Sequence, residues 1–355
     1  MAEGVLTARS FLTLLALTVV VVLAAVLAHT TGGGTDRLPM TGERAFPALE
    51  DGLESVTQIA VETAESRFVV KRGGHGEGAE RGWVAASHYG YPARETEVNA
   101  LLVELASLEL IARKTARPDL HRRLAVDAPD RPDALGRRVT LRDAQGAILA
   151  DLIVGRQRHR RTGERDRGTY VRRPGEDRAY LAAGFLDLSD RVYPWLRSKL
   201  FDVDPDRIER IDIRPVAGRR LLAIRPREGM RAMGIAGLAE GSRIQVPKVR
   251  KLPKILRGIR FDDVKPQDRV NLGAPQSLAR VATFDGLRVR VRVHRVDGDD
   301  WLTFRVEAAP DAETAVKEAL GAQRERLHGW AFRVAPYLAE RFSRSLDTLL
   351  DAGDG

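Results

Sequence analysis

The longest uncharged stretch of the chain is the feature that most limits how it can fold. Residues 10–28 read SFLTLLALTVVVVLAAVLA and contain no charged side chain. As a helix this stretch is about 28 Å long, close to the roughly 30 Å thickness of a bilayer core. It therefore predicts one N-terminal transmembrane helix, with the remainder of the chain as a large body outside the bilayer.

Two interpretations of residues 10–28 stay open. An uncleaved anchor is favoured, because the apolar core of a signal peptide normally spans about 7–15 residues. A signal peptide cleaved after Ala28 is the alternative. With an uncleaved anchor, residues 1–9 form a cytoplasmic N-terminus, residues 10–28 the anchor and residues 29–46 a flexible tether.

Composition limits what the body can be. Hydrophobic residues make up 43% and charged residues 30% of the 355 residues, as in an average soluble protein of about two domains. The formal net charge is +9. The chain has no cysteine, which excludes disulfides, a thiolate nucleophile and cysteine-based metal sites.

Beyond the tether the apolar spacing repeats itself. Two hairpin-like segments, residues 53–71 and 205–224, carry matching apolar positions. A proline-led helical pattern follows each, with apolar residues on one face. A second strand pair comes next, at residues 138–154 and 281–293, and Leu287–Val293 alternates as in a sheet with one wet face. The first helical face holds Val98, Leu101, Leu102, Leu105 and Leu108, and the second holds Val249, Leu252, Leu256 and Ile259. Pro253 is expected to kink or shorten the second helix.

The predicted fold class is α+β. Residues 47–193 and 194–310 are predicted to be two related α+β repeats, each made of antiparallel hairpins and a packed helix. Residues 311–355 are predicted to be a C-terminal helical segment that Pro336 divides into two helices.

Several segments, in this order, resemble the bacterial family called domain of unknown function 4340. They are YPARETEVNALL at residues 91–102, WLRSKL at 195–200, FDVDPDRIERIDI at 201–213 and GWAFRVAPY at 329–337. The resemblance implies a single-pass protein of the bacterial inner membrane, with the bulk of the chain on the periplasmic side. It also implies an auxiliary role beside the membrane subunits of a gliding-motility-type ABC transporter. The family has no established catalytic residues to carry over.

No motif for chemistry stands out. The chain has no Gly-x4-Gly-Lys-Ser/Thr phosphate loop and no Gly-x-Ser-x-Gly nucleophile turn. Its seven histidines are scattered without metal-ligand spacing. We therefore expect no catalytic residue, no cofactor and no metal, while a small-molecule ligand stays unidentified.

Two basic segments are candidate contacts for an anionic partner. Nucleic acid is disfavoured, because no aromatic residues are interleaved for base stacking. A solvated loop at residues 156–173 and a docked helix with a wet basic face at residues 248–260 are the alternatives. The second segment also has the pattern of a helix on a membrane surface. The candidate side chains are Arg156, Arg158, Arg160, Arg161, Lys248, Lys251 and Lys254.

Three aromatic residues near the C-terminus are candidate contacts for a partner protein, namely Trp330, Phe332 and Tyr337. Anchoring of the core is their alternative role. Together these features predict a non-catalytic, membrane-anchored auxiliary or scaffold protein of the cell envelope. An envelope module that binds an anionic ligand through residues 156–173 is the runner-up, and an enzyme with an unrecognised site is the third possibility.

Overall fold

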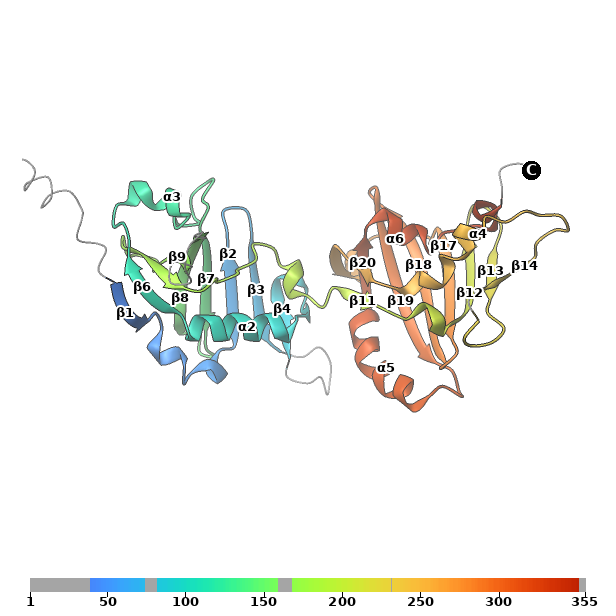
Figure 1. The fold of residues 1–355 in the computed structure, drawn as a ribbon, viewed down its shortest axis with the longest axis horizontal. Coiled ribbons are helices and arrows are strands. Elements are labelled where there is room, and N and C mark those ends of the chain that lie inside the picture. Colours follow the sequence, from blue (N-terminus) through green and yellow to red (C-terminus); the bar gives the residue numbers. More distant parts are fainter. Residues whose placement is uncertain (1–38, 74–81, 159–167, 231, 351–355) are drawn as a thin grey trace, which may run out of the picture. The chain divides into compact units, whose positions relative to one another are not determined.

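The computed structural model describes residues 39–73, 82–158, 168–230 and 232–350 (Figure 1). The predicted anchor at residues 10–28 lies outside the described residues. None of the helices in the described part is both long and apolar enough to span a membrane. Residues predicted to end the tether instead form a strand, β1 (Pro39–Arg44), which pairs with β6 (Glu109–Arg113).

The chain divides into two compact units, and each of them is discontinuous in sequence. Unit 1 ends at Arg67 and resumes at residues 100–190. Unit 2 takes residues 68–99 and then all residues from 191 onwards. The fold is α+β with mostly antiparallel sheets and few helices, which confirms the predicted class.

Seven strands of unit 1 lie in the order β1-β6-β10-β9-β8-β7-β2. The predicted pair at residues 138–154 is found as β7 and β8, which are antiparallel. The other strands and helices of unit 1 are β2 (Gln58–Glu62), β7 (Arg137–Arg142), β8 (Ile148–Arg158), β9 (Gly168–Arg172), β10 (Ala179–Ala183), α3 (His121–Leu124) and the 3-10 helices Pro47–Leu49, Leu53–Ser55 and Pro118–Leu120.

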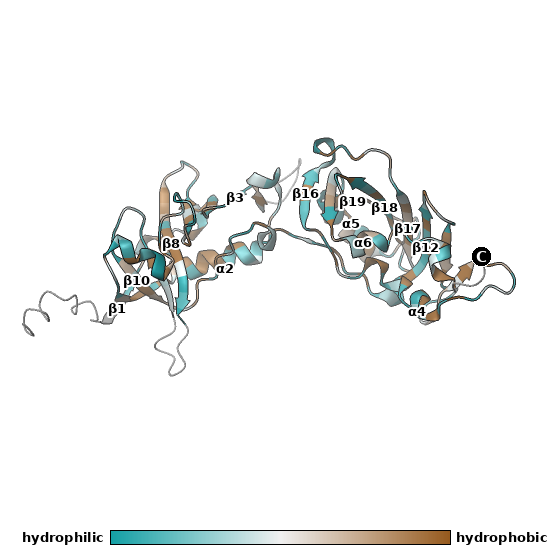
Figure 2. Ribbon diagram, turned by 90° about the horizontal axis from the view of Figure 1, so that it is seen from above, coloured by the Kyte–Doolittle hydropathy of each residue, from teal (hydrophilic) through white to brown (hydrophobic). Residues whose placement is uncertain are grey.

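Helix α2 (Glu95–Ala106) confirms the predicted proline-led helix. Val98, Leu101, Leu102 and Leu105 are all buried, as their shared face requires. Figure 2 shows hydrophobic and hydrophilic residues in turn along this helix. The spacing of apolar residues was therefore a sufficient signal here.

Unit 2 contains an eight-stranded sheet in the order β14-β13-β12-β17-β18-β19-β20-β16. Its strands are β12 (Ile208–Pro215), β13 (Leu221–Ile224), β14 (Gly234–Ala236), β16 (Asp263–Pro266), β17 (Ser277–Thr283), β18 (Leu287–Val296), β19 (Asp299–Ala308) and β20 (Trp330–Val334). Smaller ladders join β3 (Arg67–Arg72), β4 (Trp83–Ala85) and β5 (Tyr91–Pro92), and β11 (Lys199–Phe201) with β15 (Ile259–Arg260).

Helices α5 (Thr314–Leu327) and α6 (Pro336–Glu340) both contact β19. α5 buries Val316, Leu320 and Leu327. Short helices complete unit 2: α4 (Val246–Val249) and the 3-10 helices Ala86–His88, Tyr193–Trp195, Pro205–Arg207, η8 (Leu252–Leu256), Gln267–Arg269 and Leu346–Leu349.

An aromatic cluster lies in the core of unit 2 and includes a residue from its N-terminal segment. The Tyr91 ring packs edge to face against Phe261, Trp330 and Phe332, with centroids 5.3, 5.0 and 6.0 Å away. Tyr91 is fully buried, and burial raises its pKa to about 12. Residues 68–99 thus supply part of the core of unit 2.

The predicted repeats stay a prediction, although matched positions are equally buried. Val56 and Ile208 are both 0% exposed, and so are Leu105 and Leu256. The units divide the chain differently from the predicted repeats, because residues 68–99 belong to unit 2.

Two predicted helices are wrong in part. Residues 248–260 are not one helix: α4 ends at Val249, η8 spans Leu252–Leu256, and β15 follows. Pro253 cannot donate the backbone hydrogen bond of a regular helix, which accounts for the break and confirms that it shortens this helix. In the C-terminal segment, predicted as mostly helical, Trp330–Val334 is a strand between β19 and β16. Its alternating Trp330, Phe332 and Val334 have the two-residue period of a strand.

Candidate functional site

The exposed face of the large sheet of unit 2 is rich in arginine. The strand Leu287–Val296 alternates apolar and basic residues, so its valines face the core and its arginines face the other side. Figure 2 shows hydrophilic and hydrophobic residues along the strands of this sheet. Three other strands of this sheet, β12, β17 and β19, add further arginines to the same face. We call this set the arginine face; it consists of Arg210, Arg214, Arg280, Arg288, Arg290, Arg292 and Arg305.

The strand register places these arginines beside one another. Arg280 of β17 lies opposite Arg290 of β18, and Arg290 lies opposite Arg305 of β19. Neighbouring strands are about 4.8 Å apart, so the three residues form a row of like charges across the sheet. Like charges directly opposite each other destabilise a sheet. The row of three arginines is therefore unfavourable for the stability of the sheet.

Few carboxylates balance this charge. Asp212 lies opposite Arg280, yet its bidentate partner is Arg220, with both N–O distances 2.7 Å, and Arg214 adds a longer contact of 3.4 Å. Burial acts to raise the pKa of Asp212, but the hydrogen bonds from Arg220 and Arg214 outweigh it and hold the pKa below its usual value.

The other arginines of the face have no such partner. Within the part of the chain that the structure describes, six side chains make no hydrogen bond and no ion pair: Arg210, Arg280, Arg288, Arg290, Arg292 and Arg305. Glu307 lies opposite Arg288 in the register without forming an ion pair with it. All six side chains are exposed except that of Arg290, which is half-buried.

The arginine face is hollowed. A depression of about 730 Å³ is lined by six of its arginines, all but Arg292, and by the carboxylates of Glu209, Asp212, Glu307 and Asp311. Phe284 is the one aromatic residue in this lining, so a row of nucleotide bases would find no series of stacking partners. The hollow has the charge and the size to receive an acidic group of a larger partner.

The positive charge of this face reaches His328, which lines a small pocket together with Arg290, Arg292 and Arg305. The backbone N–H of Val306 donates to Nε2 of His328 at 3.1 Å, which requires an unprotonated nitrogen. Burial, together with the charges of Arg305 and Arg324, holds the pKa of His328 below its usual value. His328 is therefore neutral at pH 7 and sensitive to charge on the arginine face.

The structure brings some predicted site residues together at a different place in unit 2. Lys251 and Lys254, exposed on and before η8, line a groove with Tyr337. Lys248 is not part of this groove, because its Nζ donates to the carbonyl of Thr348 at 2.8 Å. The apolar stripe of residues 248–260 is turned into the core: Val249, Leu252, Leu256 and Ile259 are all buried. This segment therefore presents a wet basic face and no apolar face.

The first basic segment is only partly described. Arg156 is exposed on β8 and Arg158 is half-buried, whereas Arg160 and Arg161 lie outside the described residues. At its other end, Arg172 is buried and donates to the carbonyls of Val126 and Glu176, both at 2.8 Å. That end of the segment holds unit 1 together and is not a free loop.

The aromatic candidates divide in two. Trp330 and Phe332 are 4% and 0% exposed, so they take the core role that was their alternative and do not form a surface contact. Tyr337 is 61% exposed.

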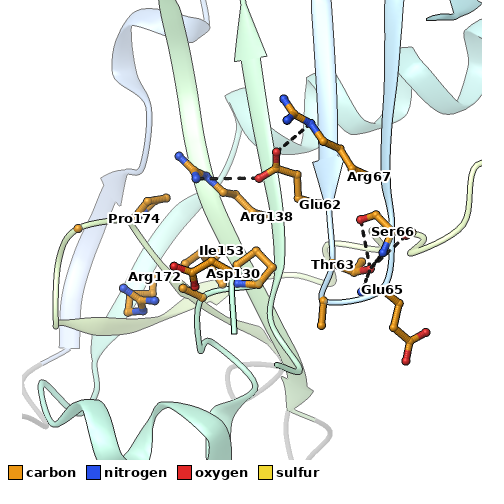
Figure 3. Close-up of a pocket in the computed structure, with 14 residues that line it drawn as sticks. Glu62, Thr63, Glu65, Ser66, Arg67, Asp130, Arg138, Ile153, Arg172 and Pro174 are labelled. Atoms are coloured by element: carbon orange, nitrogen blue, oxygen red, sulfur yellow. Dashed lines mark hydrogen bonds and ion pairs between the residues drawn. The ribbon is translucent and has the colours of Figure 1, made fainter. Parts of the chain in front are cut away.

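Unit 1 also has a hollow, of about 540 Å³, shown in Figure 3. Several of its charged side chains are paired: Glu62 accepts from Arg67 at 3.0 Å and lies 4.0 Å from Arg138. Arg138 in turn binds both oxygens of Asp151, at 2.8 and 2.5 Å. Nowhere in the described ranges do three His, Asp or Glu side chains gather as a metal ion would need.

The model of the family described as domain of unknown function (DUF4340) matches residues 83–275, more than half of the chain. The chain belongs to this family. The DUF4340 match confirms the resemblance carried by residues 91–102 and 195–213. No curated protein and no solved structure matches the chain.

The DUF4340 match ends before the strands that carry most of the arginine face. Arg210 and Arg214 lie within it, and Arg280, Arg288, Arg290, Arg292 and Arg305 lie beyond residue 275. Sequence reasoning identified the alternation of β18 as a strand with one wet face but missed the arginines as a site. The signal was present, since Arg288, Arg290 and Arg292 recur at every second position.

Proposed function

We propose that this DUF4340 protein is a non-catalytic, membrane-anchored auxiliary protein that holds an acidic partner protein on its arginine face. The observation that carries the proposal is the row formed by Arg280, Arg290 and Arg305, in which three neighbouring cations have no carboxylate bound to them. A bound acidic surface supplies the missing counter-charge and removes the repulsion within the row.

Anchoring rests on the apolar residues 10–28, and the partner class rests on the charge of the face. The family resemblance makes membrane subunits of an ABC transporter the first partners to test. An extended acidic segment suits the face well, because arginines two apart on β18 are about 6.6–6.8 Å apart, as are alternate side chains of an extended peptide.

The test compares three forms of the full-length chain purified from detergent-solubilised native membranes. One is the wild type, and one carries Arg280→Gln, Arg290→Gln and Arg305→Gln. A control carries substitutions of three exposed arginines of unit 2 that are not part of the arginine face, Arg227→Gln, Arg260→Gln and Arg269→Gln. Co-purified proteins are identified by mass spectrometry, and each is then tested for direct, salt-sensitive binding.

We expect an acidic membrane-associated protein to co-purify with the wild type and the control and to be lost from the first variant. Binding of the purified pair should weaken steeply with salt, because exposed charges are screened over about 8–10 Å at 0.10–0.15 M ionic strength. Recovery of the same proteins with all three forms would overturn the proposal. Loss from both variants would also overturn it, since net charge and not this face would then be responsible.

A further inference from the structure

A second cationic site lies in unit 2 and shares no residue with the arginine face. It is a groove of about 310 Å³ between η8 and α6 with the residues that follow α6. Leu252 and Ile255, which are 2% and 3% exposed, belong to its lining. We call this the basic groove; its polar lining residues are Lys251, Lys254, Tyr337, Glu340, Arg341 and Arg344.

The charge of the basic groove is strongly positive. Four cations meet one carboxylate, that of the exposed Glu340. Among the described residues, Lys251, Lys254 and Arg344 make no side-chain hydrogen bond and no ion pair. Three cationic groups thus converge on one small volume with their donors unused.

One arginine of the groove is fixed in place before any ligand arrives. Nη1 of Arg341 donates to the carbonyls of Lys254 and Arg257, at 3.2 and 2.8 Å. Burial lowers the pKa of Arg341 from its usual value. A charge held in a partly desolvated position interacts more strongly with an anion than a fully hydrated one does.

The rim of the groove is aromatic. Tyr337 is 61% exposed, and the guanidinium carbon of Arg341 lies 5.8 Å from its ring centroid. An exposed ring beside a fixed cation offers a flat apolar surface next to an anion site. This combination differs from the hollow of unit 1, where Glu62 and Asp151 already bind the arginines.

We infer that the basic groove binds a phosphate-bearing group, with Lys251, Lys254 and Arg344 contacting the phosphate oxygens and Tyr337 covering the organic part attached to it. A phosphate monoester carries close to two negative charges at neutral pH and several acceptor oxygens, which suits three converging donors. Two sources share this chemistry, a soluble phosphate monoester and the headgroup of an anionic phospholipid.

The reporter for binding is a tryptophan at the rim. The four native tryptophans, Trp83, Trp195, Trp301 and Trp330, are all 4–5% exposed. In a Tyr337→Trp variant the new side chain is therefore the one that acrylamide quenches readily. The full-length variant is studied first in a nonionic detergent with phenyl phosphate, and then in nanodiscs of phosphatidylcholine with and without phosphatidic acid.

If the ligand is a soluble phosphate monoester, we expect phenyl phosphate to reduce acrylamide quenching of the rim tryptophan. If the ligand is a lipid headgroup, we expect phosphatidic acid to reduce this quenching. Adding Lys251→Gln and Lys254→Gln should weaken the protecting interaction about tenfold or more, because two charge-assisted contacts are lost. The matched control adds Lys71→Gln and Lys317→Gln, two exposed lysines elsewhere in unit 2, and should bind like the parent.

Binding is also measured by calorimetry with the unsubstituted Tyr337, so that the reporter itself is not the cause of the result. Thermal unfolding of each variant checks that the fold is kept. Absence of protection by both probes would overturn the inference. Equal weakening by the groove variant and the matched control would overturn it as well, since only general charge would then be involved.

Discussion

The two sheets carry arginine in opposite electrostatic settings. In unit 1, Arg138 lies opposite Glu62 and donates from Nε and Nη2 to the two carboxylate oxygens of Asp151. In unit 2, Arg290 lies between Arg280 and Arg305. The same residue type on a strand therefore stabilises one sheet and opposes the other, and the strand register decides which. We conclude that the register pairs Arg138 with carboxylates of its own unit, whereas the row in unit 2 has no bound carboxylate.

The largest effect is expected from a substitution that breaks the contact between Arg138 and Asp151 in unit 1. Arg138→Glu removes the bidentate contact to Asp151 and places a third carboxylate beside Asp151 and Glu62. Because Arg138 is about one-third exposed, we expect a loss of roughly 1–3 kcal/mol in the stability of unit 1. Hydrogen exchange of the full-length chain measures this locally, with faster exchange in β2, β7 and β8 than in the wild type. Unchanged exchange there would show that the paired charges do not stabilise the sheet.

The matching substitution in unit 2 should have the opposite sign. Arg290→Glu places a carboxylate between Arg280 and Arg305 and replaces two repulsive neighbours with two attractive ones. We expect unit 2 to gain roughly 0.5–1.5 kcal/mol, given the usual size of cross-strand charge effects. Exchange in β17, β18 and β19 should slow, while β7 stays as in the wild type. Faster exchange in β18 would contradict the claim that the row is under repulsion.

The smallest expected effect is on His328. Burial, Arg305 and Arg324 lower its pKa, so Arg305→Gln should move the pKa up toward its usual value near 6.5. Proton NMR of the imidazole measures the change in the full-length chain. His88 is the control, because burial lowers its pKa and Asp263, not Arg305, opposes that shift. Equal movement of both histidines would point to a general loosening of unit 2.

The sign of the linked pH effect follows from the same shift. With a lowered pKa in the fold, His328 takes up its proton more readily when the chain is unfolded. Its contribution to stability should be complete above about pH 6.5 and should decrease as the pH falls below it. Arg305→Gln should make this decrease shallower, and thermal unfolding at pH 7.5 and 5.5 measures it.

Local periodicity was enough to predict much of the fold. The helical face of Val98 to Leu105 predicted α2, and the alternation of Leu287–Val293 predicted β18 with one wet face. Trp330–Val334 has the same alternation, but the neighbouring Pro336 and helical patterns led to the wrong assignment. Short strands beside helices are hard to separate by pattern, because few residues carry the signal.

The arginine face could not be predicted from any single segment of the sequence. Arg280, Arg290 and Arg305 become neighbours through the pairing of three strands, and a shift of one residue in register would separate them. The basic groove depends on a still longer separation, since it joins Lys251 and Lys254 with Arg341 and Arg344. Sequence reasoning identified the two lysines and Tyr337 individually and had no means of bringing them together.

The discontinuity of the two units limits how this protein can be cut and how it is completed during synthesis. Unit 2 receives residues 68–99 early, well before the ribosome reaches residue 191. Tyr91 can pack into this core only after Phe261, Trp330 and Phe332 have been synthesised, because these rings contact it in the folded unit. A truncated product that starts at residue 191 lacks Tyr91 and the strands β3, β4 and β5. The smallest contiguous piece that contains every part of unit 2 therefore also contains residues 100–190 of unit 1, but without the part of unit 1 that ends at Arg67.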